Sequence, residues 1–117
     1  MEKHHMNNRQ LGSLYEDKAK EYLESLGMIT LERNFRTRDG EIDLIMEDAG
    51  TLVFVEVKYR KTARSGYAVE AVTLKKQQQI RKIAREYLAT HSGPFRPIRF
   101  DCIGYTGEER HYIRNAF

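Results

Sequence analysis

The sequence predicts a single α/β domain in which a mixed β-sheet is flanked by helices. Two stretches have the apolar spacing of helices, and others alternate as strands do. These elements follow one another in the order α-β-β-β-α-β, which suits a mixed sheet with a right-handed crossover at its second helix. The 117 residues are enough for one core. We expect that core at residues 11–117, after a flexible polar segment at residues 1–10.

The first helix is predicted at residues 11–26, because apolar side chains recur at helical spacing from Tyr15 to Leu26 and Gly27 supplies a stop. Glu16 lies at the margin of this apolar stripe and not on its solvent side. An acid near a helix N-terminus can be there simply because the helix dipole favours it. Residues 28–35 then alternate as a first strand.

A β-hairpin is predicted at residues 41–48 and 51–60, joined by Ala49 and Gly50. Because side chains alternate along a strand, each arm has one aliphatic face, and the two faces must meet in the core. The residues predicted on this core face are Ile42, Leu44, Met46, Val53, Val55 and Val57.

The other face of the hairpin brings two acids together. With a two-residue turn, Asp43 faces Glu56, and Glu41 faces Lys58. Opposed side chains have Cβ atoms roughly 5 Å apart, so the two carboxylates repel unless a divalent cation lies between them. Alternatively, the acids lie at a solvated sheet edge or pair with arginines, and Glu41 with Lys58 is an ordinary ion pair.

A basic loop at residues 61–67 leads to a second helix, predicted at residues 72–90 with Thr73 as its N-cap. Lys76 and Gln77 project on the buried side of its first turn. That position is costly unless they face a polar pocket or their long stems reach water. Residues 98–105 form a further strand, and HYIRNAF a short last one. The predicted buried stripe of the helix is Ile80, Ile83, Ala84, Tyr87 and Leu88.

Charge is unevenly distributed along the chain. Residues 1–58 contain 8 Lys and Arg against 12 Asp and Glu, whereas residues 59–117 contain 12 against 5. Such halves suit a protein that binds a metal in one place and phosphates in another, although charges also simply solvate exposed faces. No apolar run approaches the ~20 residues of a membrane span, and no secretory signal is evident. The single Cys102, interpreted as small core filler, fits a reduced, cytoplasmic location.

Other chemically active residues have simpler interpretations. His4 and His5 are adjacent in a polar terminus and are interpreted as incidental. His91 and His111 have no partner at ligand spacing. Asp101, in the last long strand, is interpreted as a structural acid.

The spacing of the acids resembles the PD-(D/E)xK nuclease superfamily, in which an Asp is followed on the next strand by Glu-x-Lys and a helical acid often completes the site. Here the elements are Glu16, Asp43 and Glu56-Val57-Lys58. The chain is also similar, from about residue 12 to 117, to the YraN-type family of uncharacterised bacterial endonuclease-like proteins. In fold and site it resembles archaeal Holliday-junction resolvases. The motifs that carry the family resemblance are G-x-x-x-E with a following Ala, ERNFRTRDGEIDLI, VFVEVKYR, AVTLKKQQQI, RFDCIGY and the terminal NAF.

This resemblance implies a restriction-endonuclease-like fold and a Mg²⁺-dependent phosphodiesterase site in a single nuclease-like domain, with Mn²⁺ as a substitute. Asp43 and Glu56 would be metal ligands, helped by the main-chain carbonyl of Val57. Glu16 would hold the metal through water, or hold a second ion.

The same resemblance implies roles for the basic and amide groups. Lys58 would position and activate the attacking water, and Lys76 and Gln77 would contact the scissile phosphate or its water. These residue types suit in-line hydrolysis, since Mg²⁺ prefers hard oxygen ligands and a cationic side chain offsets charge on phosphorus.

We therefore predict an endonuclease that hydrolyses nucleic-acid phosphodiester bonds, with DNA, including branched DNA, favoured over RNA. A homodimer is a further candidate, because many nucleases with such a site cut two strands as dimers. The alternatives are a non-catalytic or partner-dependent nucleic-acid-binding protein, and a plain structural domain. The residues predicted to contact nucleic acid are Arg36, Arg38, Lys61, Arg64, Lys75, Lys82 and Arg85.

Overall fold

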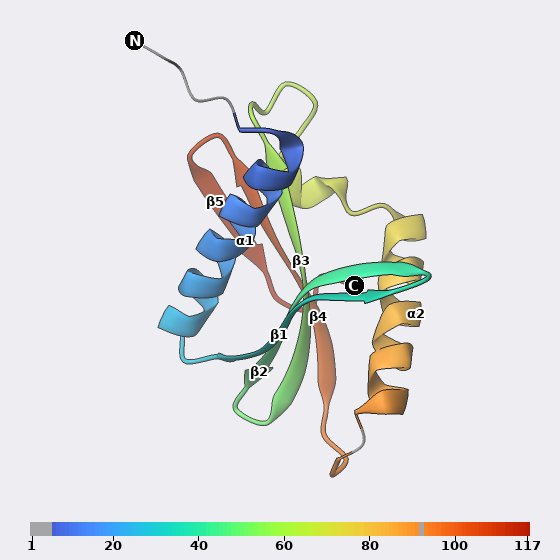
Figure 1. Ribbon diagram of the computed structural model, residues 1–117. Helices are drawn as coiled ribbons and strands as arrows, with labels where there is room; N and C mark the ends of the chain where they lie inside the picture. Colours follow the sequence, from blue (N-terminus) through green and yellow to red (C-terminus); the bar gives the residue numbers. More distant parts are fainter. Residues whose placement is uncertain (1–5, 92) are drawn as a thin grey trace.

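The computed structural model describes residues 6–91 and 93–117, so His4 and His5 lie outside the described residues. It shows a five-stranded sheet between two long helices, α1 and α2 (Figure 1). This arrangement confirms the predicted α/β fold class. The elements are α1 (Asn8–Ser25), β1 (Ile29–Thr37), β2 (Gly40–Asp48), β3 (Thr51–Arg60), the 3₁₀-helix η1 (Ala68–Ala71), α2 (Leu74–Thr90), β4 (Ile98–Thr106) and β5 (Glu109–Ile113).

The strands lie in the order β1-β2-β3-β4-β5. Three neighbouring pairs are antiparallel, and the central pair, β3 with β4, is parallel. A parallel pair cannot be joined by a tight turn, and here the connection carries η1 and α2. The mixed sheet and its crossover connection are therefore as predicted, and the predicted short last strand lies at one edge as β5.

Helix α1 covers one face of the sheet. Its residues Ala19 and Leu23 are fully buried, whereas Leu26 is 44% exposed at the end of the predicted stripe. The α1-side core consists of Ala19, Leu23, Met28, Leu44, Met46, Val53, Val55, Ile103 and Tyr105.

Helix α2 covers part of the opposite face. Its N-cap is Thr73, whose hydroxyl accepts the Lys76 N–H at 3.1 Å, as predicted. The predicted stripe packs against the sheet, with Leu88 only partly buried. The α2-side core consists of Ile42, Ile45, Leu52, Phe54, Ile80, Ile83, Ala84, Tyr87 and Phe100.

Two elements differ from the sequence prediction. Helix α1 begins at Asn8, earlier than residue 11, because Asn7 and Gln10 form a reciprocal capping box. The short η1 was not predicted, and its backbone lies close to β4 at Gly104. A Cβ atom added to Gly104 would lie 2.4 Å from the Val69 main-chain nitrogen, so a side chain is excluded there.

Among the described residues, no helix is both long enough and apolar enough to cross a membrane.

Candidate active site

The site begins where strands β2 and β3 stop pairing. The predicted hairpin register is confirmed from Asp48↔Thr51 to Leu44↔Val55, where the pairing ends. Asp43 comes next along β2, and its Oδ2 accepts the main-chain N–H of Val57 at 2.8 Å. A side chain thus occupies the place of a strand-to-strand hydrogen bond, which ties Asp43 to β3.

The same position changes the faces of β2. Ile42 packs in the α2-side core together with Ile45, whereas Leu44 packs in the α1-side core. The prediction that Ile42 shares a face with Leu44 was therefore wrong. The alternation breaks at Asp43, and the opposing residue of β1, Asn34, has a left-handed backbone with φ of 51°. Asn tolerates this conformation better than most residues, so the two strands bend together here.

This break gathers three acids, one from α1 and two from β2. One carboxylate oxygen each of Glu16, Glu41 and Asp43 lies within 4.8 Å of the others, and we call these residues the acid cluster. The Nδ2 atom of Asn34 donates to Glu16 at 2.9 Å and to Glu41 at 2.7 Å. Arg36 makes a second contact with Glu41. Strand parity put Glu41 on the face of Asp43 and opposite Lys58. In the structure Glu41 contacts Asn34 and Arg36, and it is a potential ligand that was predicted only as a partner of Lys58.

Glu56 approaches Asp43 from β3. Only 4% of Glu56 is exposed, and its Oε2 atom is buried without a hydrogen-bond partner among the described residues. Two cations lie near this oxygen, Lys76 Nζ at 3.6 Å and Lys58 Nζ at 3.8 Å. The first turn of α2 therefore does bring Lys76 to the hairpin acids.

Gln77 is turned elsewhere. Its side-chain amide donates to the main-chain carbonyl of Val72 at 3.2 Å, just before α2. Its predicted role at the phosphate stays a prediction.

Burial and mutual repulsion shift the protonation of the acids. The pKa of Asp43 is raised well above its usual value, first by burial and then by the hydrogen-bonding contact and charge of Glu56, although the Val57 N–H opposes this. The pKa of Glu16 is also raised, first by burial and then by the charges of Asp43 and Glu41, with the Asn34 hydrogen bond opposing. Both acids therefore hold protons more strongly than free carboxyl groups do, because burial and the neighbouring carboxylates disfavour the ionised form.

These residues fit a hard divalent cation. Carboxylate oxygens are the ligands that Mg²⁺ prefers. The unpartnered Oε2 of Glu56 has an unused acceptor, and the raised pKa of Asp43 shows that positive charge would stabilise its ionised form. Glu16, Glu41 and Asp43 could share such an ion, whereas Glu56 is not part of their group, and Mg²⁺ stays a prediction.

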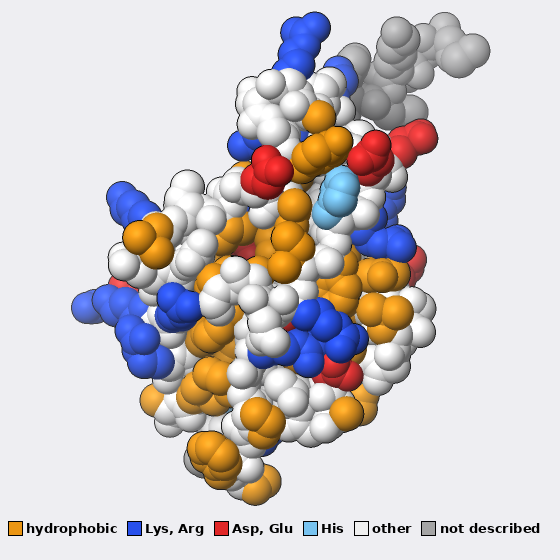
Figure 2. All heavy atoms as spheres, turned by 180° about the vertical axis from the view of Figure 1, so that it is seen from behind, with side chains coloured by type: hydrophobic (Ala, Val, Ile, Leu, Met, Phe, Trp, Pro, Cys, Tyr) orange, Lys and Arg blue, Asp and Glu red, His pale blue; other side chains and the backbone are white. Residues whose placement is uncertain are grey.

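The predicted nucleic-acid contacts are all on the surface. Figure 2 shows Lys and Arg side chains gathered along the border of the molecule where α2 lies. Lys82 also forms an ion pair with Asp39 at 3.1 Å, which joins α2 to the β1–β2 turn. The exposed residues are Arg36, Arg38, Lys61, Arg64, Lys75, Lys82 and Arg85.

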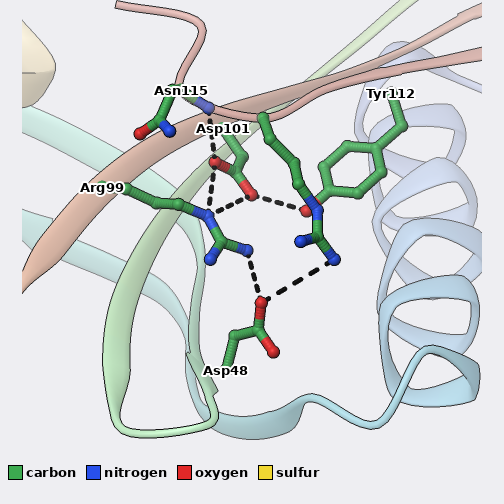
Figure 3. A network of polar contacts seen from close by, with 6 residues as sticks. Asp48, Arg99, Asp101, Tyr112 and Asn115 are labelled. Atoms are coloured by element: carbon green, nitrogen blue, oxygen red, sulfur yellow. Dashed lines mark hydrogen bonds and ion pairs between the residues drawn. The ribbon is translucent and has the colours of Figure 1, made fainter.

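Asp101 belongs to a separate network (Figure 3). It is fully buried and accepts hydrogen bonds from Arg99, from the Tyr112 hydroxyl and from the Asn115 main-chain N–H. Arg99 also donates to Asp48 at 2.8 Å, in the hairpin turn. The network joins the β2–β3 turn to β4 and to the segment after β5, as the structural interpretation of Asp101 predicted.

Cys102 is buried, with 1% of its surface exposed. Burial, followed by the charge of Glu56, raises the pKa of its thiol to about 12. A thiol that stays protonated is a poor nucleophile, which supports its interpretation as core filler.

Comparison with known proteins identifies a family that this chain matches. The model of the Uncharacterised protein family UPF0102 matches residues 15–105. A UPF0102 protein of Fusobacterium nucleatum is 44% identical over 110 residues, covering 94% of this chain and 92% of that protein. One from Halorhodospira halophila is 47% identical over 109 residues, covering 93% and 88%. The UPF0102 protein YraN of Escherichia coli is 41% identical over 114 residues, covering 96% and 87%.

Proposed function

Since the chain belongs to the UPF0102 family, whose name assigns no activity, we propose its function from the site: a metal-dependent endonuclease that hydrolyses phosphodiester bonds of nucleic acid. The observation that carries the proposal is the meeting of Asp43, Glu56 and Lys76. The buried Glu56, the half-buried Asp43 on the neighbouring strand and a lysine from α2 converge where the strands separate. A purely structural role would leave the repulsion between the acids without a purpose.

Asp43 and Glu56 would hold Mg²⁺ or Mn²⁺, together with the main-chain carbonyl of Val57. Glu16 and Glu41, which share the acid cluster with Asp43, would complete the ligands or hold bound water. When bound, the ion supplies a Lewis acid for the phosphate and lowers the pKa of water.

The two lysines provide the remaining chemistry. Lys58 and Lys76 both approach Glu56 Oε2, so their ammonium groups would lie beside a phosphate bound to the metal. There they would orient the attacking water by hydrogen bonds and offset the negative charge that builds up on the phosphate oxygens.

DNA is the proposed substrate. The exposed basic residues on α2, the 61–67 loop and the β1–β2 turn offer contacts to phosphates without reading bases. The buried, reduced Cys102 suits action in the cytoplasm.

The test is a cleavage assay on duplex, single-stranded, flap and four-way-junction DNA of one sequence, and on RNA, with Mg²⁺, Mn²⁺ or EDTA. Asp43→Asn and Glu56→Gln should abolish cleavage, since each replaces a carboxylate with an amide of the same shape. Glu47→Gln, on β2 and paired with Arg96, is the matched control and should cut normally.

Cleavage that continues in EDTA would contradict the metal-dependent mechanism. Binding without cleavage under every condition, unchanged by both substitutions, would favour the non-catalytic alternative.

A further inference from the structure

A cavity of about 350 Å³ lies between the N-terminal half of α1 and strands β1 and β2. Its volume is at the lower end for ligand pockets. Glu16 and Glu41 line it, but Asp43 does not, so the cavity adjoins the acid cluster on the side away from β3. It is therefore a space beside the proposed catalytic site.

Gly12 is an unusual residue in the wall of this cavity. It stands inside α1, where glycine costs roughly 1 kcal/mol relative to alanine. Its backbone does not require glycine, and an added Cβ would meet nothing within 4 Å. The space in front of Gly12 is therefore open to a ligand.

The lining of the cavity carries two arginines as well as the two glutamates. Arg9 is exposed, lies three residues before Gly12 and shares its side of the helix. Arg36 lines the opposite wall, and its side chain is 75% exposed although it contacts Glu41. A guanidinium has five N–H donors, so Arg36 keeps donors for a ligand. Ser13, one residue along α1, adds a hydroxyl.

We propose that this cavity binds a phosphate of the nucleic-acid strand next to the phosphate that is cut. Arg9 and Arg36 are its ligands, and Gly12 keeps the space open for the strand. The proposal rests on the proposed function and adds a direction to it: the strand runs from the hairpin acids along the N-terminal half of α1.

Gly12→Leu tests the space. Leucine is a better helix former than glycine, so the variant should be at least as stable as the wild type, while its side chain fills the cavity. Binding of a fluorescein-labelled oligonucleotide, measured by anisotropy with Ca²⁺ replacing Mg²⁺, should weaken roughly tenfold or more, the scale of lost charge-assisted hydrogen bonds. Ser25→Leu, which puts the same side chain at the other end of α1, is the matched control and should bind as the wild type does. Unchanged binding by a folded Gly12→Leu variant would overturn the proposal.

Arg9→Ala tests the phosphate contact. Loss of one phosphate contact should lower the slope of log affinity against log salt by about 0.7 for a single strand or 0.9 for a duplex. Lys20→Ala removes the same charge from the other end of α1, where Lys20 pairs with Glu24, and should leave the slope unchanged. An equal change in both variants would show a general charge effect and contradict a specific site.

The phosphate can be an internal diester or a terminal monoester. Oligonucleotides with a 5′-phosphate, a 3′-phosphate or neither distinguish these sources. A loss of affinity in Gly12→Leu that is equal for all three assigns the cavity to an internal phosphate, and a loss confined to one end assigns it to that terminus.

The outcomes separate this proposal from the proposed function. If cleavage requires Asp43 but is unchanged in Gly12→Leu, the proposed phosphate site is wrong and the proposed nuclease function stands. If oligonucleotide binding depends on Gly12 and Arg9 but no cleavage occurs, the phosphate site stands and the nuclease function is wrong. A wild type that binds no nucleic acid would overturn both.

Discussion

The Oδ2 atom of Asp43 lies 2.8 Å from the main-chain nitrogen of Val57, so that a carboxylate replaces part of the hydrogen bonding between β2 and β3. The acid is fixed by the backbone of the neighbouring strand and not by a flexible cation. A substitution that keeps the oxygen but removes the charge therefore distinguishes the structural role of Asp43 from its role as a charged ligand.

Asp43→Asn should stabilise the metal-free protein. Asparagine keeps an acceptor for the Val57 N–H and removes the repulsion with Glu56, worth about 1 kcal/mol for opposed like charges. We expect Tm at pH 8 in EDTA to rise by roughly 4 °C, measured by differential scanning calorimetry. The Glu47→Gln control should stay within about 1 °C of the wild type. A fall in Tm of Asp43→Asn would show that the carboxylate contributes to folding.

Metal ions should stabilise the protein more at pH 8 than at pH 5.5. Folding raises the pKa values of Asp43 and Glu16. At a pH between the pKa of the unfolded chain and that of the folded protein, the folded state therefore binds more protons than the unfolded state. These groups therefore lower stability as pH rises through that window, and a cation must displace their protons to bind.

The measurement is the rise in Tm on adding Mg²⁺ or Mn²⁺ at each pH, with calorimetric titrations in two buffers to count the protons released. Asp43→Asn should lose most of the rise. An equal rise in Tm at both pH values would show that metal binding does not displace protons from these acids.

Gly104→Ala should destabilise the protein by about 1–3 kcal/mol or more, because a Cβ would collide with the rigid backbone of η1 at Val69. Urea unfolding followed by circular dichroism gives the free energy of unfolding. Gly12→Ala is the opposite case and should gain about 1 kcal/mol. Equal effects of the two substitutions would show that η1 can move away from β4.

Arg99→Leu should cost about 3–5 kcal/mol, since it leaves the fully buried Asp101 carboxylate without its cation. Tyr112→Phe removes one hydrogen bond and should cost about 1–2 kcal/mol. Arg114, 54% exposed and 3.8 Å from Asp48, provides the control, since its substitution by alanine should cost less than about 1 kcal/mol. The free energy of unfolding is again measured with urea. Similar decreases for the Arg99 and Arg114 variants would contradict the central place of Asp101 in the network.

Cys102 should resist thiol reagents in the folded protein. Burial raises its pKa to about 12, so little thiolate exists at pH 8. Labelling by iodoacetamide, followed by mass spectrometry, should be slow in buffer and fast in urea. Rapid labelling of the folded protein would show that β4 opens locally.

Much of the fold follows from local patterns in the sequence. The small Ala49-Gly50 turn fixed the register that the structure shows from Asp48 to Leu44, and Thr73 marked the start of α2. Asn7 and Gln10 have the spacing of a capping box, a signal that would have placed the start of α1 and directed attention to Arg9. The four residues of η1 are too few for a periodic pattern.

The site itself was predicted only in part. Pairing parity brought Asp43 to Glu56, but it placed Ile42 on the wrong face and Glu41 opposite Lys58. The change of face lies beside Asn34, a residue of a different strand whose left-handed backbone interrupts the pairing of β1 with β2. Parity within one hairpin cannot contain that information, because the cause is a tertiary contact.

The origin of the site residues has a consequence for the time at which activity can appear. Asp43 and Glu56 lie in one short hairpin, whereas Glu16 and Lys76 come from helices docked on opposite faces of the sheet. A nascent chain that has emerged from the ribosome only as far as β3 would carry two repelling acids and no α2 lysine. On the proposed function, the hairpin alone would not cut, and cutting would begin only after α2 has been synthesised and has docked on the sheet.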